Sequence, residues 1–460
     1  MTSWLPAGSL ARPAYLSLAD HVARAVADGR LPAGEQLPTQ RHMAHQLGVS
    51  VQTVSRAYDE LARRGITSGE VGRGTFIRAL RPEPDPPFIP ERLGELIDLS
   101  ILKPVCESIH LETMKAALIG LADSLPPSST LSFRPNVVFP RHRALAVEWL
   151  KRCGLVTEAR NVHLTNGATS AMTVALMAAA PPGTTVVTEE IGHHTLVPLA
   201  AYLGLKLRGL GIDSEGILPE ALERACQEGE VRAVYLLPNA VGPTAATMGA
   251  KRRAALVAIA RRHELLIIEN DVLGPLLAER LPPFAALAPE RTLYFTSFTK
   301  CVMPGLRTGY LVAPDRLTAA VANRHLVTSW IATPLIAEIA TRWVEDGTAL
   351  ELVLWQRAAL TRRQTVAAGI LDGVRYASHP EGLHIWLPLP PARKEDEFVS
   401  HARLQGVAIA PGASFVTSPS ARSPAVRISV GSTSEADMRA GLAIVANLVR
   451  SDPEPVLLAI

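Results

Sequence analysis

The sequence lacks long apolar runs and closely spaced cysteines. None of its apolar stretches approaches the ~18 to 20 residues that a membrane-spanning helix needs, and its first residues lack the pattern of a secretory signal. The cysteines Cys106, Cys153, Cys226 and Cys301 are far apart, which excludes a disulfide framework and a zinc site. We therefore expect reduced thiols in the core of a cytoplasmic protein.

The net positive charge is also small, and the excess of basic residues is unevenly distributed along the chain. The formal net charge of the 460 residues is only +3. Residues 1–80 contain nine arginines, no lysine and six acidic residues, whereas the rest of the chain has 37 basic and 37 acidic residues. Because nucleic-acid binding depends on neutralising phosphates, the excess positive charge favours DNA binding by the first part of the chain.

A proline-rich stretch separates the two parts. Residues 81–90 contain five prolines, which have no backbone N–H and hold φ fixed, so neither a helix nor a central strand can form there. The stretch is typical of a semi-rigid linker. The sequence therefore predicts a first domain over residues 12–80, a linker over 81–97 and a larger domain over 98–455.

The first domain has the capping and turn residues expected of three helices and a hairpin. The pattern predicts helices over residues 15–27, over 40–47 with Thr39 as N-cap, and from Ser50 to about Arg64, with Gly48 and Gly65 as helix ends. Residues 69–77 then predict a tight β-hairpin with Arg73 at its tip. Two short helices joined through a glycine turn are typical of a helix-turn-helix.

The second helix of such a pair enters the major groove of duplex DNA. Its first turns would present Ser50, Gln52, Thr53 and Arg56. Gln and Arg can pair with the edges of adenine and guanine, and Ser and Thr can reach phosphates. These side chains are the candidate base and backbone contacts.

Residues 12–78 resemble the winged helix-turn-helix of the GntR family. The matching motifs are GRLPAG at 29–34, LPTQR at 37–41, LGVS at 47–50, TV at 53–54, AY at 57–58, Leu61 and GRGTF at 72–76. Val51 departs from the family, which commonly has arginine there. The resemblance implies operator DNA as a partner, contacted by Arg41, Ser50, Gln52, Thr53, Arg56 and Arg73.

Beyond the linker, apolar strands alternate with Ala- and Leu-rich helices. Strands are predicted over residues 185–188, 233–237, 265–268 and 293–296, and helices over 170–179 and 250–262. Continuous apolar strands separated by helices indicate a parallel α/β sheet covered on both faces. From about residue 350 to 455 the pattern predicts a smaller α+β lobe with strands over 384–387 and 426–429 and a last helix over 434–448.

Lys300 differs from the other lysines. The chain has seven lysines against 39 arginines, and the other six lie in polar or helical contexts typical of surface charges. Lys300 follows an apolar strand, lies among hydroxyl residues and precedes Arg307 by seven positions. A lysine in this setting suits an imine with an aldehyde cofactor that bears a phosphate.

The sequence SFTKCVMPGLRTGY at 297–310 resembles the lysine motif of fold-type I aminotransferases, in the form found in MocR-type regulators. The resemblance extends over residues 130–450 and implies that Lys300 binds pyridoxal phosphate as a Schiff base. It also implies that Ser297 and Arg307 are phosphate ligands and that Ala168 and Thr169 meet the phosphate at a helix start. The ring of His193 would stack on the cofactor, and Arg427 would pair with an effector carboxylate.

Three positions depart from the aminotransferase pattern. The family aspartate that pairs with the pyridine nitrogen is replaced by Asn270, with Asp271 one residue later. Adjacent strand residues point to opposite faces, so Asp271 can substitute only if the strand end is bulged or shifted. A family tyrosine is Leu273, and a family asparagine is Gly242. An amide cannot keep the pyridine protonated, so we expect cofactor binding with weak carbanion chemistry.

The sequence therefore predicts a MocR/GntR-type transcriptional regulator, a winged helix-turn-helix joined to a fold-type I transferase domain. We expect pyridoxal phosphate, and in addition a small amino compound, as ligands, operator DNA as partner and a homodimer as the assembly. Two alternatives stay open. The chain is an active aminotransferase with a DNA-binding head, or a regulator that senses its ligand without the cofactor.

Overall fold

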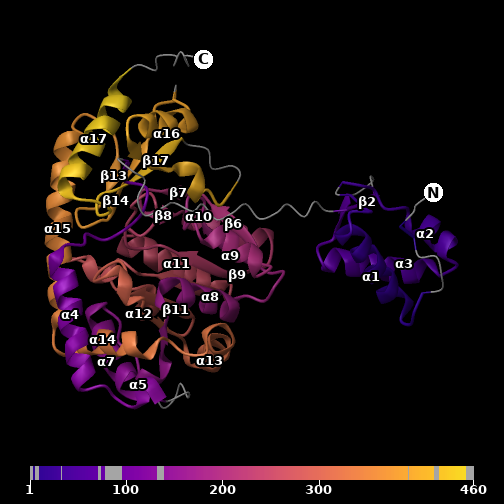
Figure 1. Cartoon of the computed structure of the whole chain (residues 1–460), viewed down its shortest axis with the longest axis horizontal. Helices are drawn as coiled ribbons and strands as arrows, with labels where there is room; N and C mark the ends of the chain where they lie inside the picture. Colours follow the sequence, from indigo (N-terminus) through magenta and orange to yellow (C-terminus); the bar gives the residue numbers. More distant parts are fainter. Residues whose placement is uncertain are drawn as a thin grey trace. The chain divides into compact units, whose positions relative to one another are not determined.

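The computed structural model describes residues 4–5, 10–32, 34–70, 74–77, 96–131, 139–391, 393–418 and 424–451. The chain divides into two compact units, residues 1–91 and 92–460, and Figure 1 labels many of their helices and strands. Most of the expected linker lies outside the described residues. Its last residue, Ile97, is already part of a strand, because its amide donates to the carbonyl of Gly406 over 2.8 Å.

The first unit contains three helices and a hairpin. They are α1 (Ala14–Ala27), α2 (Gln40–Leu47), α3 (Val51–Arg63), β1 (Thr67–Glu70) and β2 (Gly74–Ile77). Thr39 caps α2 by accepting from the His42 amide, Ser50 caps α3 by accepting from the Thr53 amide, and Gly48 ends α2 at φ 64°. These local signals are the ones the sequence carries, and the predicted helices are confirmed.

A small apolar core holds this unit together. Leu18 and Val22 of α1 are fully buried against Val54 and Leu61 of α3. The hydroxyl of Tyr58 donates to the carbonyl of Pro38 over 2.7 Å and so fixes α3 to the segment before α2. The two helices of the helix-turn-helix are therefore held in one relative orientation.

A seven-stranded sheet forms the centre of the second unit. Its strands are β4 (Val162–Thr165), β5 (Thr185–Glu189), β6 (Lys206–Leu210), β9 (Val231–Leu236), β10 (Leu266–Asn270), β11 (Thr292–Ser297) and β12 (Gly309–Val312). The spatial order is β4-β12-β11-β10-β9-β5-β6. The four predicted strands are confirmed as β5, β9, β10 and β11.

The expected wholly parallel sheet is wrong at one strand. β12 runs antiparallel to both β11 and β4, whereas the pairs among β6, β5, β9, β10 and β11 are parallel. A parallel neighbour needs a long crossover, usually with a helix. Only residues 298–308 separate β11 from β12, so the chain turns back on itself.

Helices cover both faces of this sheet. On one face, Met172 of α8 (Gly167–Ala179) packs with Tyr235 and Ile268; on the other, α10 (Pro219–Glu228), α11 (Ala250–Arg262) and α12 (Phe284–Leu287) pack against residues such as Val234 and Ile267. Adjacent residues of one strand thus face opposite layers, as strand geometry requires. The remaining large-lobe elements are α4 (Ser108–Asp123), α5 (Ser128–Leu131), α7 (Pro140–Arg152), α9 (Leu196–Tyr202), α13 (Asp315–Ser329), α14 (Pro334–Glu345), β7 (Ile212–Asp213), β8 (Gly216–Ile217) and the short 3-10 turns η1 (Ala159–Asn161), η2 (Gly274–Leu276) and η3 (Pro304–Leu306).

The smaller lobe is α+β, as expected. It contains α15 (Thr348–Ile370), β13 (Ala377–Ser378), β14 (His384–Pro388), α16 (Glu395–Leu404), β15 (Val407–Ala408), β16 (Ala410–Pro411), η4 (Gly412–Phe415), β17 (Ala425–Ser429) and α17 (Glu435–Arg450). Its sheet has the order β13-β14-β17-β16. The lobe also includes a segment the sequence did not assign to it, because β3 (Ile97–Asp98) pairs in parallel with β15.

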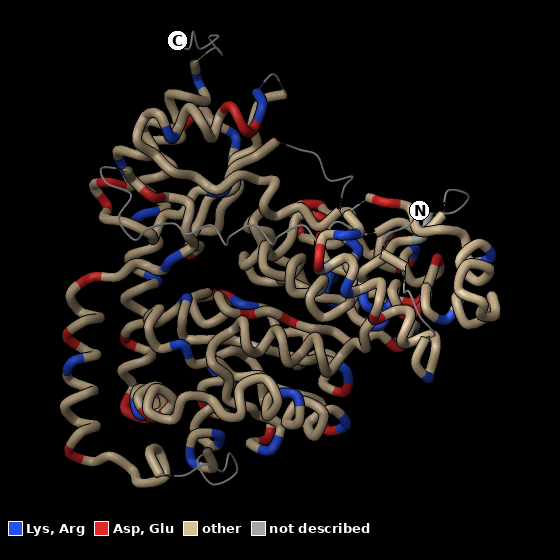
Figure 2. Tube along the Cα trace, turned by 45° about the vertical axis from the view of Figure 1, so that its right-hand side comes forward, with Lys and Arg blue, Asp and Glu red and all other residues tan. Residues whose placement is uncertain are grey.

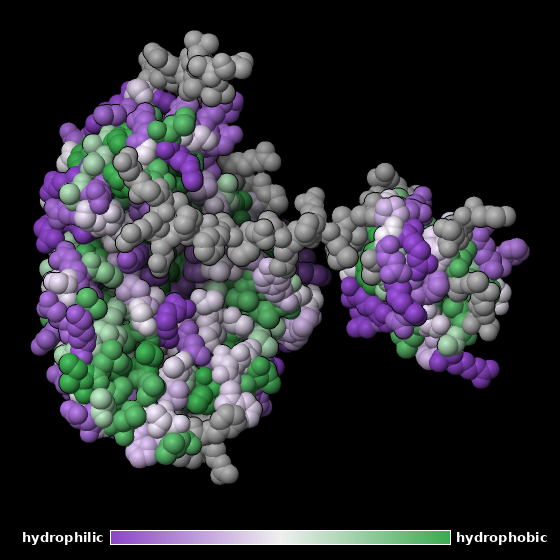
Figure 3. All heavy atoms as spheres, in the orientation of Figure 1, coloured by the Kyte–Doolittle hydropathy of each residue, from purple (hydrophilic) through white to green (hydrophobic). Residues whose placement is uncertain are grey.

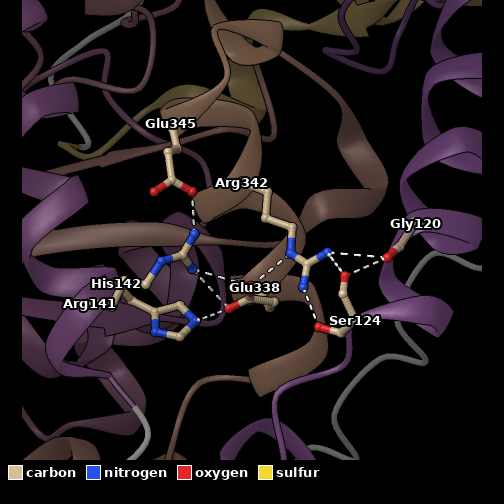
Figure 4. Close-up of polar contacts among 7 residues, drawn as sticks. All are labelled: Gly120, Ser124, Arg141, His142, Glu338, Arg342 and Glu345. Atoms are coloured by element: carbon tan, nitrogen blue, oxygen red, sulfur yellow. Dashed lines mark hydrogen bonds and ion pairs between the residues drawn. The ribbon is translucent and has the colours of Figure 1, made fainter.

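A buried carboxylate joins three helices of the large lobe (Figure 4). Glu338 of α14 lies 3.0 Å from Nε2 of His142, 2.8 Å from Nε of Arg342 and 3.2 Å from Nη1 of Arg141. Arg342 also donates to the carbonyl of Ser124, just after α4, over 2.8 Å. These partners lower the pKa of Glu338 to about 2, with His142 as the largest cause. The network fixes α4 and α7 against α14.

Surface charge agrees with the sequence expectation for the lysines. Lys103, Lys115, Lys151, Lys206, Lys251 and Lys394 are all exposed. Figure 2 shows basic and acidic positions interspersed over the second unit. None of the helices in the described ranges combines the length and apolar composition that a bilayer crossing requires.

The cysteine expectation is correct only in part. All four thiols are free, but Cys106 is exposed and Cys226 partly exposed, whereas Cys153 and Cys301 are buried. Cys106 lies in the irregular segment before α4 and is exposed there.

Candidate functional site

Several candidate residues meet at the carboxyl edge of the seven-stranded sheet. Lys300 follows β11, Asn270 ends β10, His193 follows β5, and α8 begins directly after β4. Parallel strands place their carboxyl ends at one edge, where ligands of α/β proteins bind. Arg427 reaches the same place from β17 of the smaller lobe, since its charge acts on both Lys300 and His193.

The start of α8 meets the guanidinium of Arg307. A Cβ added at Gly167, where φ is 81°, would lie 3.4 Å from Cζ of Arg307. Ala168 and Thr169 follow in the first turn, partly buried and exposed respectively. Arg307 itself has φ 39°, a strained left-handed conformation that non-glycine residues adopt mainly where function requires it. A helix start beside a guanidinium is a site for an anion.

Unsatisfied hydroxyl groups lie at the ends of the same strands, after β4 and at the end of β11. Oγ of Ser297 is buried without a hydrogen-bond partner, and so are Oγ1 of Thr299 and Oγ of Ser170, among the residues that the structure describes. Buried polar atoms in native proteins almost always have partners. Ser170 lies in the first turn of α8, and Ser297 pairs with Gly309, two residues after Arg307, so these orphaned hydroxyls fit the oxygen atoms of a phosphate.

Lys300 is held by a backbone carbonyl. Its Nζ donates to the carbonyl oxygen of Leu102, in the segment that follows β3. Loss of hydration on burial, together with the charges of Arg427 and Arg307, lowers the pKa of Lys300 from 10.5 to about 8. An amine with this pKa is partly unprotonated near neutral pH and can act as a nucleophile.

Arg427 is likewise bound to a carbonyl. It is buried in the smaller lobe, its Nη2 donates to the carbonyl of Ser100 over 2.6 Å, and its Cζ lies 4.7 Å from the ring centre of Phe415. Within the described part of the chain, its Nε has no hydrogen-bond partner. Burial lowers the pKa of Arg427 to about 10, so the guanidinium stays charged at neutral pH. A carboxylate ligand would supply the missing counter-charge.

Two histidines extend the site. Nδ1 of His193 lies 2.9 Å from Oγ1 of Thr195, and its ring stacks on that of His194 at 5.0 Å. Loss of hydration, His194 and the charges of Lys300 and Arg427 lower the pKa of His193 well below 6.5, so the ring is neutral at pH 7. A neutral, flat ring is suitable for stacking on a cofactor.

Sequence reasoning missed His384 and His194. His384, on β14, is buried, and its Nε2 lies 3.0 Å from the carbonyl of Gly242 and 2.9 Å from that of Pro243. It thereby links the smaller lobe to the loop after β9. No local motif marks either histidine, since each acquires its position only through folding.

Asn270 and Asp271 point to different layers. Nδ2 of Asn270 donates to the hydroxyl of Tyr235 over 2.8 Å, and that hydroxyl lies 3.3 Å from Sδ of Met172 in α8. Asn270 is therefore on the α8 side of the sheet, with the other candidate residues. Leu273 is buried in the core on this side and brings no hydroxyl.

Asp271 is not brought to this site. Its carboxylate accepts from Nδ2 of Asn239 at 2.6 Å, from Nη2 of Arg280 at 2.7 Å and from the hydroxyl of Tyr294 at 2.7 Å. The side chain is fully buried. The condition under which Asp271 could replace the family aspartate, a bulge that turns it to the Asn270 side, is not met. Asn239 and Arg280 are further residues that the sequence did not single out.

The candidate DNA contacts lie on the first unit. Arg41 and Gln52 are exposed on α2 and α3. Ser50 and Thr53 begin α3, and their hydroxyls lie 2.8 Å apart while Ser50 also caps the helix. The structure therefore presents Arg41 and Gln52 freely, whereas the Ser50 hydroxyl has a structural partner as well.

Arg56 is exposed on α3 and stacks on an aromatic ring. Its Cζ lies 4.1 Å from the ring centre of Tyr15 on α1. This contact orients the guanidinium while leaving its N–H groups available. The hairpin after α3 is confirmed by the antiparallel pairing of β1 with β2. Arg73, expected at its tip, lies outside the described residues.

Two family models match the chain. "Aminotransferase class I and II" matches residues 102–445, and "Bacterial regulatory proteins, gntR family" matches residues 14–77. The archaeal alanine:glyoxylate aminotransferase is similar in structure, with a TM-score of 0.71, 22% identity and coverage of 77% of this chain and 90% of that one. That likeness concerns the fold.

Regulators are similar to the chain along both parts. The HTH-type transcriptional regulator YdeF of Bacillus subtilis is 27% identical over 448 residues, which cover 93% of this chain and 92% of that protein. The HTH-type pyridoxine biosynthesis transcriptional regulator PdxR of Corynebacterium glutamicum is 30% identical over 329 residues, 66% of this chain and 67% of that protein. The chain therefore belongs to the class I and II aminotransferase family over most of its length and carries a gntR-family helix-turn-helix domain, which makes it a transcriptional regulator of the MocR type.

Proposed function

We propose that this regulator binds pyridoxal phosphate, with a small amino compound as a further effector, in the large domain of residues 98–455. The observation that supports this most is the combination at the sheet edge of Lys300, the orphaned hydroxyl of Ser297 and the guanidinium of Arg307 beside the start of α8. The name of the pyridoxine biosynthesis regulator PdxR points to the same vitamin chemistry.

Each residue has a distinct task in this proposal. Lys300 attaches the aldehyde, while Ser297, Arg307 and the amides of Ala168 and Thr169 hold the phosphate. His193 stacks on the ring, and Arg427 binds an effector carboxylate through a planar, bidentate contact. When bound, the cofactor supplies an electron sink for bonds at the carbon next to an amine. By the family resemblance, Asn270 would be the residue that faces the pyridine nitrogen, because Asp271 is held elsewhere by Asn239, Arg280 and Tyr294.

Asn270 favours a regulator over an enzyme. An amide carries no charge that would keep the ring nitrogen protonated, so the electron sink is weak and turnover of amino compounds is slow. Incubation of the purified chain with amino acids and a keto acid acceptor measures this. Turnover at ordinary enzyme rates, roughly 1 per second or faster, would favour the alternative of an active aminotransferase.

Visible absorbance tests cofactor binding. We expect wild type mixed with pyridoxal phosphate to develop a band that survives gel filtration. Lys300→Ala should lose this band completely, because the substitution removes the amine that attaches the aldehyde at the phosphate-binding site. Lys103→Ala, which removes an exposed lysine from the same domain, is the matched control and should keep the band. A wild type that stays colourless would favour the cofactor-free sensor.

DNA binding by residues 12–80 can be tested by substitution in α2 and α3. Arg41→Ala and Arg56→Ala should each weaken binding to the DNA upstream of the protein's own gene by about 5- to 100-fold, the cost of a lost phosphate or base contact. Arg64→Ala is the control, since Arg64 forms ion pairs with Asp20 and Glu60 and is occupied within the unit. Unchanged affinity in both test variants would contradict the assignment of this face to DNA. The test covers Ser50, Gln52 and Thr53 indirectly, as members of the same face.

An exposed apolar face supports a homodimer. Leu111, Leu118 and Ile119 of α4 are 59%, 51% and 67% exposed, and Leu335 of α14 is 39% exposed. Figure 3 shows hydrophobic surface over this part of the second unit. Contiguous apolar surface of this kind marks an interaction site in soluble proteins. Two copies joined here would bring two DNA-binding heads to one operator, in the compartment that holds the DNA.

A further inference from the structure

The segment from Leu99 to Leu102, called the strap below, holds both cations that the proposed function assigns to ligands. The carbonyl of Ser100 accepts from Nη2 of Arg427 at 2.6 Å, and the carbonyl of Leu102 accepts from Nζ of Lys300. Neither cation has a carboxylate partner among the described residues. Backbone carbonyls therefore occupy the guanidinium that a carboxylate would bind and the amine with which an aldehyde would react.

The strap is attached to the smaller lobe. The amide of Leu99 donates to the carbonyl of Ala408 and its carbonyl accepts from the amide of Ser429, both over 2.8 Å. On the other side, a Cβ at Gly431 would lie 2.3 Å from the carbonyl of Lys103, so the backbones are in close contact there. The bond from Lys300 to Leu102 therefore ties a segment of the smaller lobe to the large-lobe sheet.

Ligand chemistry weakens both contacts of the strap. A carboxylate is a stronger partner for a guanidinium than a neutral carbonyl, so it competes with Ser100 for Arg427. At Lys300, the amine nitrogen adds to the aldehyde carbon and water leaves as the C=N bond forms. The nitrogen then has one hydrogen or none in place of the three of an ammonium group, and it is fixed in the plane of the C=N bond, so its hydrogen bond to Leu102 is weakened or lost.

The strap also lies close in sequence to the segment that leads to the DNA-binding domain. Residues 78–95 join the helix-turn-helix to β3, and the strap follows β3 directly. We infer that ligand binding at Lys300 and Arg427 releases the strap, and that this release is the change transmitted along the chain to the DNA-binding domain. The inference rests on the proposed function and adds its route of regulation. A ligand can shift such an equilibrium only through contacts that differ between the two states, and Ser100 and Leu102 supply those contacts.

Hydrogen exchange of the full chain tests the release. Pyridoxal phosphate added to wild type should speed exchange of the hydrogen-bonded amides of Leu99 and Ser100 by roughly tenfold, because the strap loses one or two of the carbonyl contacts that hold it in place. Lys300→Met should show the same increase with no ligand added, because it removes the donor to Leu102. Lys103→Met, which removes an exposed strap-side lysine without that bond, should leave exchange unchanged.

DNA affinity provides the second readout. If the strap carries the signal, Lys300→Met without ligand should shift affinity for the upstream DNA in the direction that pyridoxal phosphate shifts wild type, and Lys103→Met should not. If wild type becomes coloured with cofactor but the exchange rate of the strap amides does not change, the inference that ligand binding releases the strap is wrong. The proposed function would remain valid in that case. A wild type that stays colourless would overturn cofactor binding and with it the ligand-driven release. Unchanged strap exchange in Lys300→Met would then exclude the Leu102 contact as well.

Discussion

Asp271→Asn should lower the free energy of unfolding by about 3–5 kcal/mol, the usual cost of breaking a buried ion pair from one side. The carboxylate is fully buried and bonded to Asn239, Arg280 and Tyr294. Its loss leaves the guanidinium of Arg280, 11% exposed, without its counter-charge. Urea denaturation of the wild type and the variant measures the difference.

Asp213→Asn is the matched control. Asp213 pairs with Arg252 at 2.6 Å, but its side chain is 40% exposed, so water can replace the lost contact and we expect a cost below about 1 kcal/mol. Arg280→Met in the Asp271→Asn background should restore part of the stability, because the uncompensated charge is removed. Asp271→Asn should also keep the colour with pyridoxal phosphate. A variant that is stable but colourless would mean that Asp271 serves the cofactor.

The pair at 270 and 271 shows what sequence could and could not determine here. Strand alternation predicted that the two side chains face opposite layers, and the structure agrees. Which layer held partners for a carboxylate could not be predicted, because Asn239, Arg280 and Tyr294 come from three separate segments. Only the folded sheet brings them together.

Elements that depend on local sequence signals could be predicted reliably, whereas features that depend on contacts between distant segments could not. The caps Thr39 and Ser50 act within three residues, so the helices they begin could be placed from sequence. The antiparallel direction of β12 and the pairing of β3 with β15 depend on segments distant in the chain. The strap left no sequence signal at all, since Ser100 and Leu102 act through carbonyl groups that every residue has.

Lys300 should react with aldehydes with a midpoint near pH 8. Burial and the charges of Arg427 and Arg307 lower its pKa from 10.5 to about 8. Because the lowered pKa releases the reactive unprotonated amine at lower pH, the rate should rise about tenfold per pH unit up to pH 8 and level off above it. At pH 7 this gives roughly 300-fold more reactive amine than an ordinary surface lysine has.

A neutral aldehyde isolates this effect from phosphate binding. Brief exposure to butanal, borohydride reduction and mass spectrometry would give the modification rate of Lys300 at each pH, with the exposed Lys103 as an internal reference for the reagent. Of the two neighbouring guanidinium groups, Arg427 has the larger effect on the pKa of Lys300, so Arg427→Met should move the Lys300 midpoint upward. A purely steric explanation of the reactivity of Lys300 does not predict this shift. A wild-type midpoint near 10 would contradict the buried, cation-flanked environment that makes Lys300 the reactive group of the site.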